Sequence, residues 1–228
     1  SKTRQPPARI NTPAIIVLVI IAGLLVASAI GAYHLRKQIV AREVLSEGKT
    51  ALEKGQYREA CRYLQVYLLH YPDDADWLGR YADANLKVTP LTSNRIANAI
   101  GAYRRLLRLR PEDLKTYEQL IKLYTRVRDY NELVHICRQR LARVPDDVPT
   151  TLSLVRGLVV LRKNDEAQKE LEGLLAKAPG EEDIYILLSG LAEIAQTGDS
   201  FALAKQRLDD GLAINPRSAR LLAYRARL

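Results

Sequence analysis

The chain has 228 residues and a formal net charge of +9, which leaves acidic proteins, nucleic acid and anionic lipid as candidate partners. Apolar residues recur at helical spacing through most of the sequence, and no stretch alternates as a sheet strand would, so an all-α protein is predicted. The sequence contains no glycine-rich phosphate loop and no nucleophile elbow, and its 2 cysteines and 3 histidines are scattered. It therefore predicts no catalytic site, no metal site and no cofactor, as in a non-enzymatic protein.

The first residues form a basic tail followed by a long apolar run. Residues 1–13 are polar, basic and contain proline, and we expect them to be disordered. Residues 14–33 carry no charge, and about 20 such residues can cross the hydrocarbon core of a bilayer. A cleaved signal peptide is the alternative, but its apolar region is usually about 7–15 residues long and a small-residue cleavage site follows it. The sequence therefore predicts a single transmembrane helix over 14–33.

Small residues form a stripe on this predicted membrane helix. Gly23, Ala27 and Gly31 stand four residues apart, which permits close approach of another helix in lipid, although glycine and alanine are also common in membrane helices generally. The hypothesis is that this face packs against another membrane subunit or a second copy. Lysine and arginine occur on both sides of the run, so charge does not fix its orientation. We expect the following domain outside the cytoplasm, in a bacterial periplasm; a domain facing the cytosol is the alternative.

A pattern of two amphipathic helices begins after the apolar run. In residues 41–74 a turn at Gly55 separates the two helices, and Pro72 ends the second. Gly48 and Ala60 are small enough for the two helices to approach closely. Later prolines repeat this position at spacings of 39, 34, 34 and 37 residues; they are Pro111, Pro145, Pro179 and Pro216. Twelve residues before each of the five prolines stand, in order, Ala60, Ala99, Leu133, Ala167 and Ala204.

These features resemble the tetratricopeptide repeat (TPR), a helix–turn–helix unit of 34 residues. The resemblance covers residues 41–228 and implies an all-α, right-handed superhelix of about five helix pairs over 34–217. The predicted units are 41–74, 75–113, 114–147, 148–181 and 182–217, with the first helix of a further repeat at 218–228. The extra residues of the longer units fall in loops at 88–93 and 196–200. Because residues 218–228 are not polar all round, we expect either further repeats or a partner beyond them.

The first helices of repeats in this family line a concave groove, and the resemblance places five basic residues there. These residues are Arg42, Lys49, Lys115, Lys122 and Arg156. A basic groove with apolar neighbours would accept an extended peptide that carries carboxylates. The Lys and Asn pair with which some family members clamp chaperone tails is absent, since Leu45 and Lys49 occupy those positions, so that ligand is not predicted.

The second helices carry arginine-rich runs, RRLLRLR from residue 104 and RQRLAR from residue 138. We predict a convex basic face that would contact anionic lipid or an acidic subunit. Its residues are Arg104, Arg105, Arg108, Arg138 and Arg140. Helical repeats that read RNA use polar pairs at fixed positions, and no such code recurs, so nucleic acid is the weaker alternative.

The sequence thus predicts a membrane-anchored TPR scaffold that docks and organises protein partners at or in a membrane, within a larger complex. Its predicted partners are subunits of a membrane complex or acidic peptide segments, with the bilayer contacted through residues 14–33. A receptor that binds client peptides during protein transport or folding is the alternative function, and an RNA-binding helical repeat protein is a minor one.

Overall fold

The computed structural model describes residues 23, 24, 28, 31, 39–195 and 199–228. These residues contain α-helices and no strand, so the predicted all-α class is confirmed for this part of the chain. The chain divides into two compact units, Ser1–Thr89 and Pro90–Leu228. The division falls inside the second predicted repeat, in the loop between α3 (Ala75–Lys87) and α4 (Ser93–Leu109). The repeat boundaries proposed from the proline spacing stay a prediction.

The first unit consists of the helical residues 39–53, α2 (Tyr57–His70) and α3. A side chain at Gly48 would be crowded, because a Cβ there would lie 3.2 Å from the Leu64 Cδ2 atom of α2. Ala60 on α2 is fully buried. The two small residues therefore let the helices approach closely, as the sequence predicts. The turn between them contains Gly55 at a φ of +70°, a left-handed conformation that glycine adopts without steric cost.

Trp77 lies on α3 among charged and aromatic side chains of the first unit. Its ring meets the Tyr67 ring edge-on, with 6.4 Å between centroids. Lys49 Nζ lies 5.3 Å and the Arg80 guanidinium carbon 4.9 Å from the centroid of the indole ring. Trp77 is half-buried. Its faces attract cations, since the π-electron quadrupole of indole favours positive charge.

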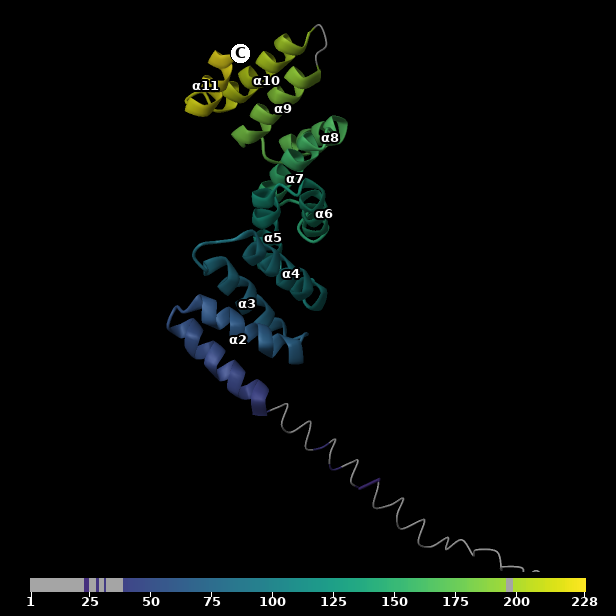
Figure 1. Cartoon of the computed structure of the whole chain (residues 1–228). Helices are drawn as coiled ribbons and strands as arrows, with labels where there is room; N and C mark the ends of the chain where they lie inside the picture. The colour runs from purple at the N-terminus through teal and green to yellow at the C-terminus, as the bar shows by residue number, and fades with distance from the viewer. Residues whose placement is uncertain (1–22, 25–27, 29–30, 32–38, 196–198) are drawn as a thin grey trace, which may run out of the picture. The chain divides into compact units, whose positions relative to one another are not determined.

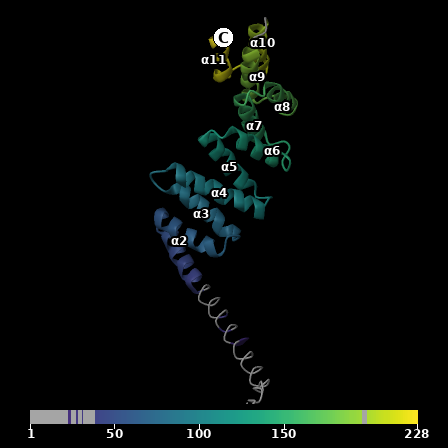
Figure 2. The ribbon, with the colours of Figure 1, turned by 45° about the vertical axis from the view of Figure 1, so that its right-hand side comes forward.

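The second unit consists of eight described helices that pack in chain order (Figures 1 and 2). Besides these sequential contacts, α7 touches α9 and α9 touches α11. The helices after α4 are α5 (Leu114–Val127), α6 (Tyr130–Leu141), α7 (Val148–Val160), α8 (Asn164–Lys177), α9 (Glu182–Ala195), α10 (Ser200–Ile214) and α11 (Ala219–Arg227).

The small residues twelve positions before each proline lie in the core. Ala60, Ala99, Ala167 and Ala204 are 0% exposed, and Leu133 at the same offset is 1% exposed. The even-numbered helix of each pair can lie close to its neighbours only if the side chain at this position is small or fits the space between the helices. The pattern in the sequence thus identified a buried position that recurs through the array.

Each even-numbered helix ends shortly before one of the five prolines, because proline cannot continue a helix. The residue two positions after the proline directly precedes the first residue of the next helix. Asp74 and Asp113 accept a hydrogen bond from the backbone N–H of Trp77 and Thr116, and Ser218 accepts one from Leu221. These side chains satisfy backbone donors that a helix start leaves without an intrahelical partner.

Most of the predicted membrane helix lies outside the described residues, as do the tail 1–13 and Ala27. Within it the structure describes Gly23, Leu24, Ser28 and Gly31, all in helical conformation. A Cβ at Gly23 or Gly31 would meet no heavy atom within 4 Å. No helix among the described residues combines the length and the apolar character that crossing a membrane requires. The transmembrane helix over 14–33 stays a prediction.

Candidate partner-binding grooves

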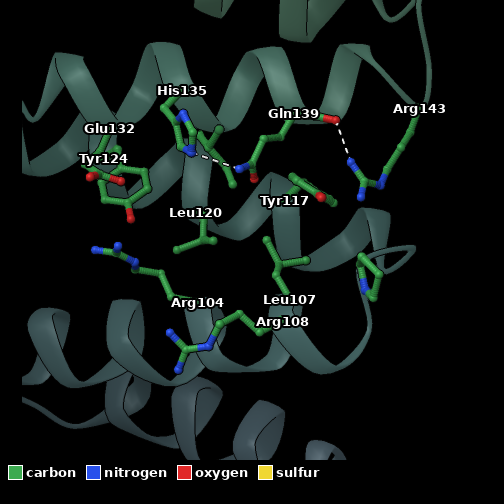
Figure 3. Close-up of a pocket in the computed structure, with 12 residues that line it drawn as sticks. Arg104, Leu107, Arg108, Tyr117, Leu120, Tyr124, Glu132, His135, Gln139 and Arg143 are labelled. Carbon is green, nitrogen blue, oxygen red and sulfur yellow. Dashed lines mark hydrogen bonds between the residues drawn. The ribbon is translucent and has the colours of Figure 1, made fainter.

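A groove lies between α4 and α6 in the second unit, and α5 forms its floor (Figure 3). We name it groove 1; its volume is about 420 Å³. The floor consists of the buried side chains Tyr117, Leu120 and Tyr124. The walls are basic and polar: α4 contributes Arg104 and Arg108, and the α6 side contributes His135, Gln139 and Arg143. Glu132 is the acidic residue among its lining side chains.

The tyrosines of the groove floor are held in the neutral form. Burial, opposed by Arg104 and assisted by the nearby Glu132 carboxylate, raises the pKa of Tyr124 to about 12. Burial also raises the pKa of Tyr117, against the opposing effect of Arg143. Both hydroxyls therefore stay protonated at neutral pH, and they add no negative charge to a groove with three arginines.

The arginines of groove 1 differ in what they already contact. Arg143 lies 5.4 Å from the centroid of the Tyr117 ring, and its Nε is 3.9 Å from a carboxylate oxygen of Glu112, whose side chain is 85% exposed. Arg104 extends from α4 towards Tyr124 (Figure 3). Neither Arg104 nor Arg108 makes a hydrogen bond or an ion pair with another described residue, and both are exposed. Groove 1 thus presents two guanidinium groups whose donors face solvent.

The same groove recurs one repeat further along the chain. Groove 2 lies between α6 and α8, has α7 as its floor, and has a volume of about 380 Å³. All its lining residues except Leu174 stand 34 positions after lining residues of groove 1, so Arg138 corresponds to Arg104 and Lys177 to Arg143. In groove 2 the two cations are paired within the chain. Arg138 donates to Glu166 at 2.5 Å and Lys177 to Asp146 at 2.7 Å.

A third groove of about 620 Å³ lies on the side of the odd-numbered helices, between α7 and α9. We name it groove 3. It contains Arg156 and Leu152, which the family resemblance places in the concave groove. Arg156 donates to Asp183 at 2.5 Å, and Arg220 of α11 donates to the second oxygen of the same carboxylate. One carboxylate thus satisfies two guanidinium groups, and groove 3 is less basic than the sequence predicts.

The five predicted groove residues are distributed over the two units. Arg42 and Lys49 lie in the first unit, where Arg42 is exposed and Lys49 contacts Trp77. Lys115 and Lys122 are exposed on α5 and do not line groove 3. Their common binding role stays a prediction.

The residues of the predicted convex basic face lie at different places in the structure. Arg104 and Arg108 line groove 1, Arg138 lines groove 2, and Arg105 of α4 is half-buried and lines neither. The placement of Arg140 on an exposed face is wrong.

Arg140 is 9% exposed and joins three elements. Its Nε donates to Asp147, Nη2 lies 3.2 Å from Glu118, and Nη1 donates to the Leu114 carbonyl at 2.9 Å. A buried guanidinium requires such partners, because an unpaired charge in the interior is strongly unfavourable. Arg140 is therefore a structural residue between α5, α6 and the start of α7.

The two cysteines lie in the core. Cys61 and Cys137 are both buried free thiols, and burial raises the pKa of Cys137 to about 12. A neutral, inaccessible thiol is a poor nucleophile and a poor metal ligand. Among the described residues no group of three or more His, Cys, Asp or Glu side chains is placed to hold a metal ion.

Sequence reasoning missed Tyr124, Glu132, His135 and Gln139 as parts of groove 1. A usable signal was present, because several charges are repeated 34 residues later. Glu132 recurs as Glu166, and Glu112 recurs as Asp146. Comparison of the two repeats position by position would have identified the residues that face each other across successive even-numbered helices.

No protein-family model matches the sequence, and no curated protein matches it. Solved structures are similar to it. MamA from Desulfovibrio magneticus RS-1 aligns with a TM-score of 0.56 and 15% identity, over 79% of this chain and 97% of that one. A second MamA structure aligns with a TM-score of 0.59 and 14% identity, over 79% and 94% of the two chains. YrrB, described as a TPR protein with an unusual peptide-binding site, aligns with a TM-score of 0.59 and 13% identity, over 79% and 89%.

Identities this low show a shared fold and nothing more. The likeness covers most of this chain and nearly all of each matched structure, in agreement with the paired helices, the proline-terminated even-numbered helices and the buried small residues. The chain therefore has the tetratricopeptide-type helical-repeat fold that its sequence resembles.

Proposed function

We propose that this protein is a non-enzymatic, membrane-anchored scaffold that docks protein partners through its helical repeats. The observation that carries the proposal is groove 1, where Arg104 and Arg108 make no hydrogen bond and no ion pair with another described residue. Solvent-exposed guanidinium groups over a closed apolar floor favour a ligand with carboxylates.

The fold supports a role in binding. Helical repeats present extended surfaces on stacked helix pairs, and such surfaces commonly receive other proteins. YrrB, which shares the fold, has a peptide-binding site. Fold alone does not determine function, so the proposal depends on the grooves of this chain and on their charges.

The anchoring half of the proposal rests on the sequence of residues 14–33, which is apolar for long enough to span a bilayer. We further propose that the repeats lie on the extracytoplasmic side of a bacterial membrane. Sodium carbonate extraction of membranes separates an integral protein from a peripheral one: the full chain should remain in the membrane pellet. Release of the chain into the supernatant would contradict the anchor.

Orientation can be tested with a membrane-impermeant maleimide. Both native cysteines are buried, so a cysteine at the exposed position Lys122 should be the main reactive thiol in whole cells. Labelling of Lys122→Cys without cell lysis is expected for an extracytoplasmic domain. Labelling that appears only after lysis would place the repeats in the cytosol.

The docking function is tested by purification of the protein in mild detergent, with mass spectrometry before and after a high-salt wash. A scaffold should retain a fixed, stoichiometric set of partners through the wash. A heterogeneous set that is lost in salt would support the client-receptor alternative, because exposed charge pairs are screened by salt. Absence of any reproducible partner would contradict both functions.

A further inference from the structure

Grooves 1 and 2 have equivalent positions in the repeat but different internal pairing. In groove 2 the chain supplies its own carboxylates, since Glu166 pairs with Arg138 and Asp146 with Lys177. In groove 1 the equivalent acidic residues are Glu132 and Glu112. The ion pair between Glu112 and Arg143 is long, at 3.9 Å, and the Glu112 side chain is mostly exposed. Arg104 has no ion pair with a described residue. Groove 1 also contains an additional cation, because Arg108 stands where groove 2 has Ala142.

The spacing of the free cations indicates the shape of a ligand. Arg104 and Arg108 are one turn apart on α4, about 6 Å along the helix axis. In an extended peptide, side chains at alternate positions point the same way and are separated by about 6.8 Å. Two carboxylates in an acid–x–acid sequence would therefore match the two guanidinium groups, and the middle side chain would face α6, where Gln139 and His135 lie (Figure 3).

We propose that groove 1 binds an extended acidic segment of a partner protein, with two alternate carboxylates on Arg104 and Arg108. The proposal rests on the function proposed above and names the chemistry of the partner. A charge-assisted bond is stronger where water is partly excluded, and the buried Tyr117, Leu120 and Tyr124 close the floor of the groove. An extended chain fits between two helices better than a flat layer of anionic lipid, because the groove is recessed.

The experiment uses the full chain in detergent and two fluorescein-labelled peptides, one with a central Glu-Leu-Glu and one with Gln-Leu-Gln. Fluorescence anisotropy should show binding of the Glu-Leu-Glu peptide and at least about tenfold weaker binding of the Gln-Leu-Gln peptide, because charge-assisted hydrogen bonds are lost. In the variant Arg104→Glu/Arg108→Glu the affinity for Glu-Leu-Glu should fall by about tenfold or more for the same reason.

The matched control is Arg138→Glu/Lys177→Glu in groove 2, which changes the net charge of the protein by the same amount. Its affinity should stay within about twofold of the wild type, because distant exposed charges are screened by salt. Equal losses in the two variants would overturn the proposal, since net charge alone would then explain binding. Equal binding of the two peptides would also overturn it.

Vesicles containing phosphatidylserine provide a test of the lipid alternative. If the Glu-Leu-Glu peptide does not bind but vesicles bind in a manner that depends on Arg104 and Arg108, the proposal is wrong and the groove contacts lipid. If the wild type does not bind the Glu-Leu-Glu peptide and Arg104→Glu/Arg108→Glu retains a stable partner set, this inference is overturned and the scaffold function is left intact. Loss of all partners from the wild-type protein would instead contradict the scaffold function.

Discussion

Groove 1 and groove 2 have the same architecture at positions 34 residues apart, but they differ in available charge. Each lies between two successive even-numbered helices, and each has an arginine at the same wall position, Arg104 in one and Arg138 in the other. Arg138 is bound to Glu166 of the same chain, whereas Arg104 is not paired with a described residue. A repeat array can therefore offer several equivalent grooves of which internal ion pairs leave only some open to a charged partner.

Groove 3 extends this comparison to the other side of the helix pairs. Its predicted binding cation, Arg156, shares Asp183 with Arg220. The basic groove expected from the family resemblance is thus partly neutralised, while the even-numbered helices present the unpaired cations. Acidic side chains of the next repeat therefore determine which basic residues remain available to a charged partner.

The helix α6 forms a wall of both grooves, and Arg140 fixes it to α5 and to the start of α7. Arg140→Ala is expected to lower the free energy of unfolding by about 3 kcal/mol, because Asp147 would lose its buried partner. Chemical denaturation followed by circular dichroism measures the change. The control is Arg138→Ala on the same helix, whose ion pair is about half exposed and should contribute at most about 1 kcal/mol. Equal costs for the two substitutions would contradict the structural role of Arg140.

Removal of the internal carboxylates should convert groove 2 into a second binding site. In the background Arg104→Glu/Arg108→Glu, the added substitutions Glu166→Gln/Glu170→Gln free Arg138 and remove a lining carboxylate. Affinity for the Glu-Leu-Glu peptide should rise by about tenfold, the equivalent of one charge-assisted hydrogen bond. Anisotropy titration provides the measurement. Glu172→Gln, also on α8 but outside the groove lining, should not reproduce the gain; if it does, the effect comes from net charge.

Glycines on the outer helices of the two grooves give a matched pair for stability. Gly101 of α4 and Gly173 of α8 are exposed, and a Cβ at either position would meet no heavy atom within 4 Å. Gly101→Ala and Gly173→Ala should each raise the free energy of unfolding by about 0.8–1.0 kcal/mol, the difference in helix propensity. Thermal or urea unfolding measures it. A loss of stability in either variant would show that the helix there lacks the open space described.

The floors of the two grooves predict a small difference at alkaline pH. Groove 1 has Tyr124, with a pKa raised to about 12 mainly by burial, where the next repeat has Leu158. A folded-state pKa above the ordinary value of about 10 means that the unfolded chain loses this proton first as the pH rises. Stability should therefore fall between about pH 10 and 12. Tyr124→Phe should make that fall less steep, as measured by urea unfolding at several pH values, and an unchanged slope would contradict the assignment.

The sequence predicted the fold well because its main determinants are local and periodic. Prolines end the even-numbered helices, and Ala99, Ala167 and Ala204 are buried at one recurring offset. The close approach at Gly48 was also predictable from residue size. Arg128 and Arg162 were not recognised as turn residues, although each has a φ near +60° at the position that Gly55 occupies in the first repeat. The regular 34-residue spacing forces the turn there even where the residue is not glycine.

The candidate site was less predictable, because its state depends on pairs that are 27 to 37 residues apart. Arg138–Glu166, Arg156–Asp183 and Arg220–Asp183 join neighbouring repeats, and helix periodicity within one repeat does not reveal them. The position of Arg140 was also not revealed by the pattern within one repeat. Its counterparts 34 residues away, Leu106 and Leu174, are buried, so alignment of the repeats would have indicated a core position, whereas the run RQRLAR suggested a basic surface.

Groove 1 is proposed to receive the acidic segment, and grooves 2 and 3 are not. Photo-crosslinking of the full chain distinguishes the three grooves. The probe is a Glu-x-Glu peptide with p-benzoylphenylalanine at the middle position, and peptide mapping locates the crosslinks. Crosslinks are expected on α6 near His135 and Gln139, and they should be lost in Arg104→Glu/Arg108→Glu. Crosslinks that map to α8 or to α7 and α9, or that persist in the variant, would contradict binding of the acidic segment in groove 1.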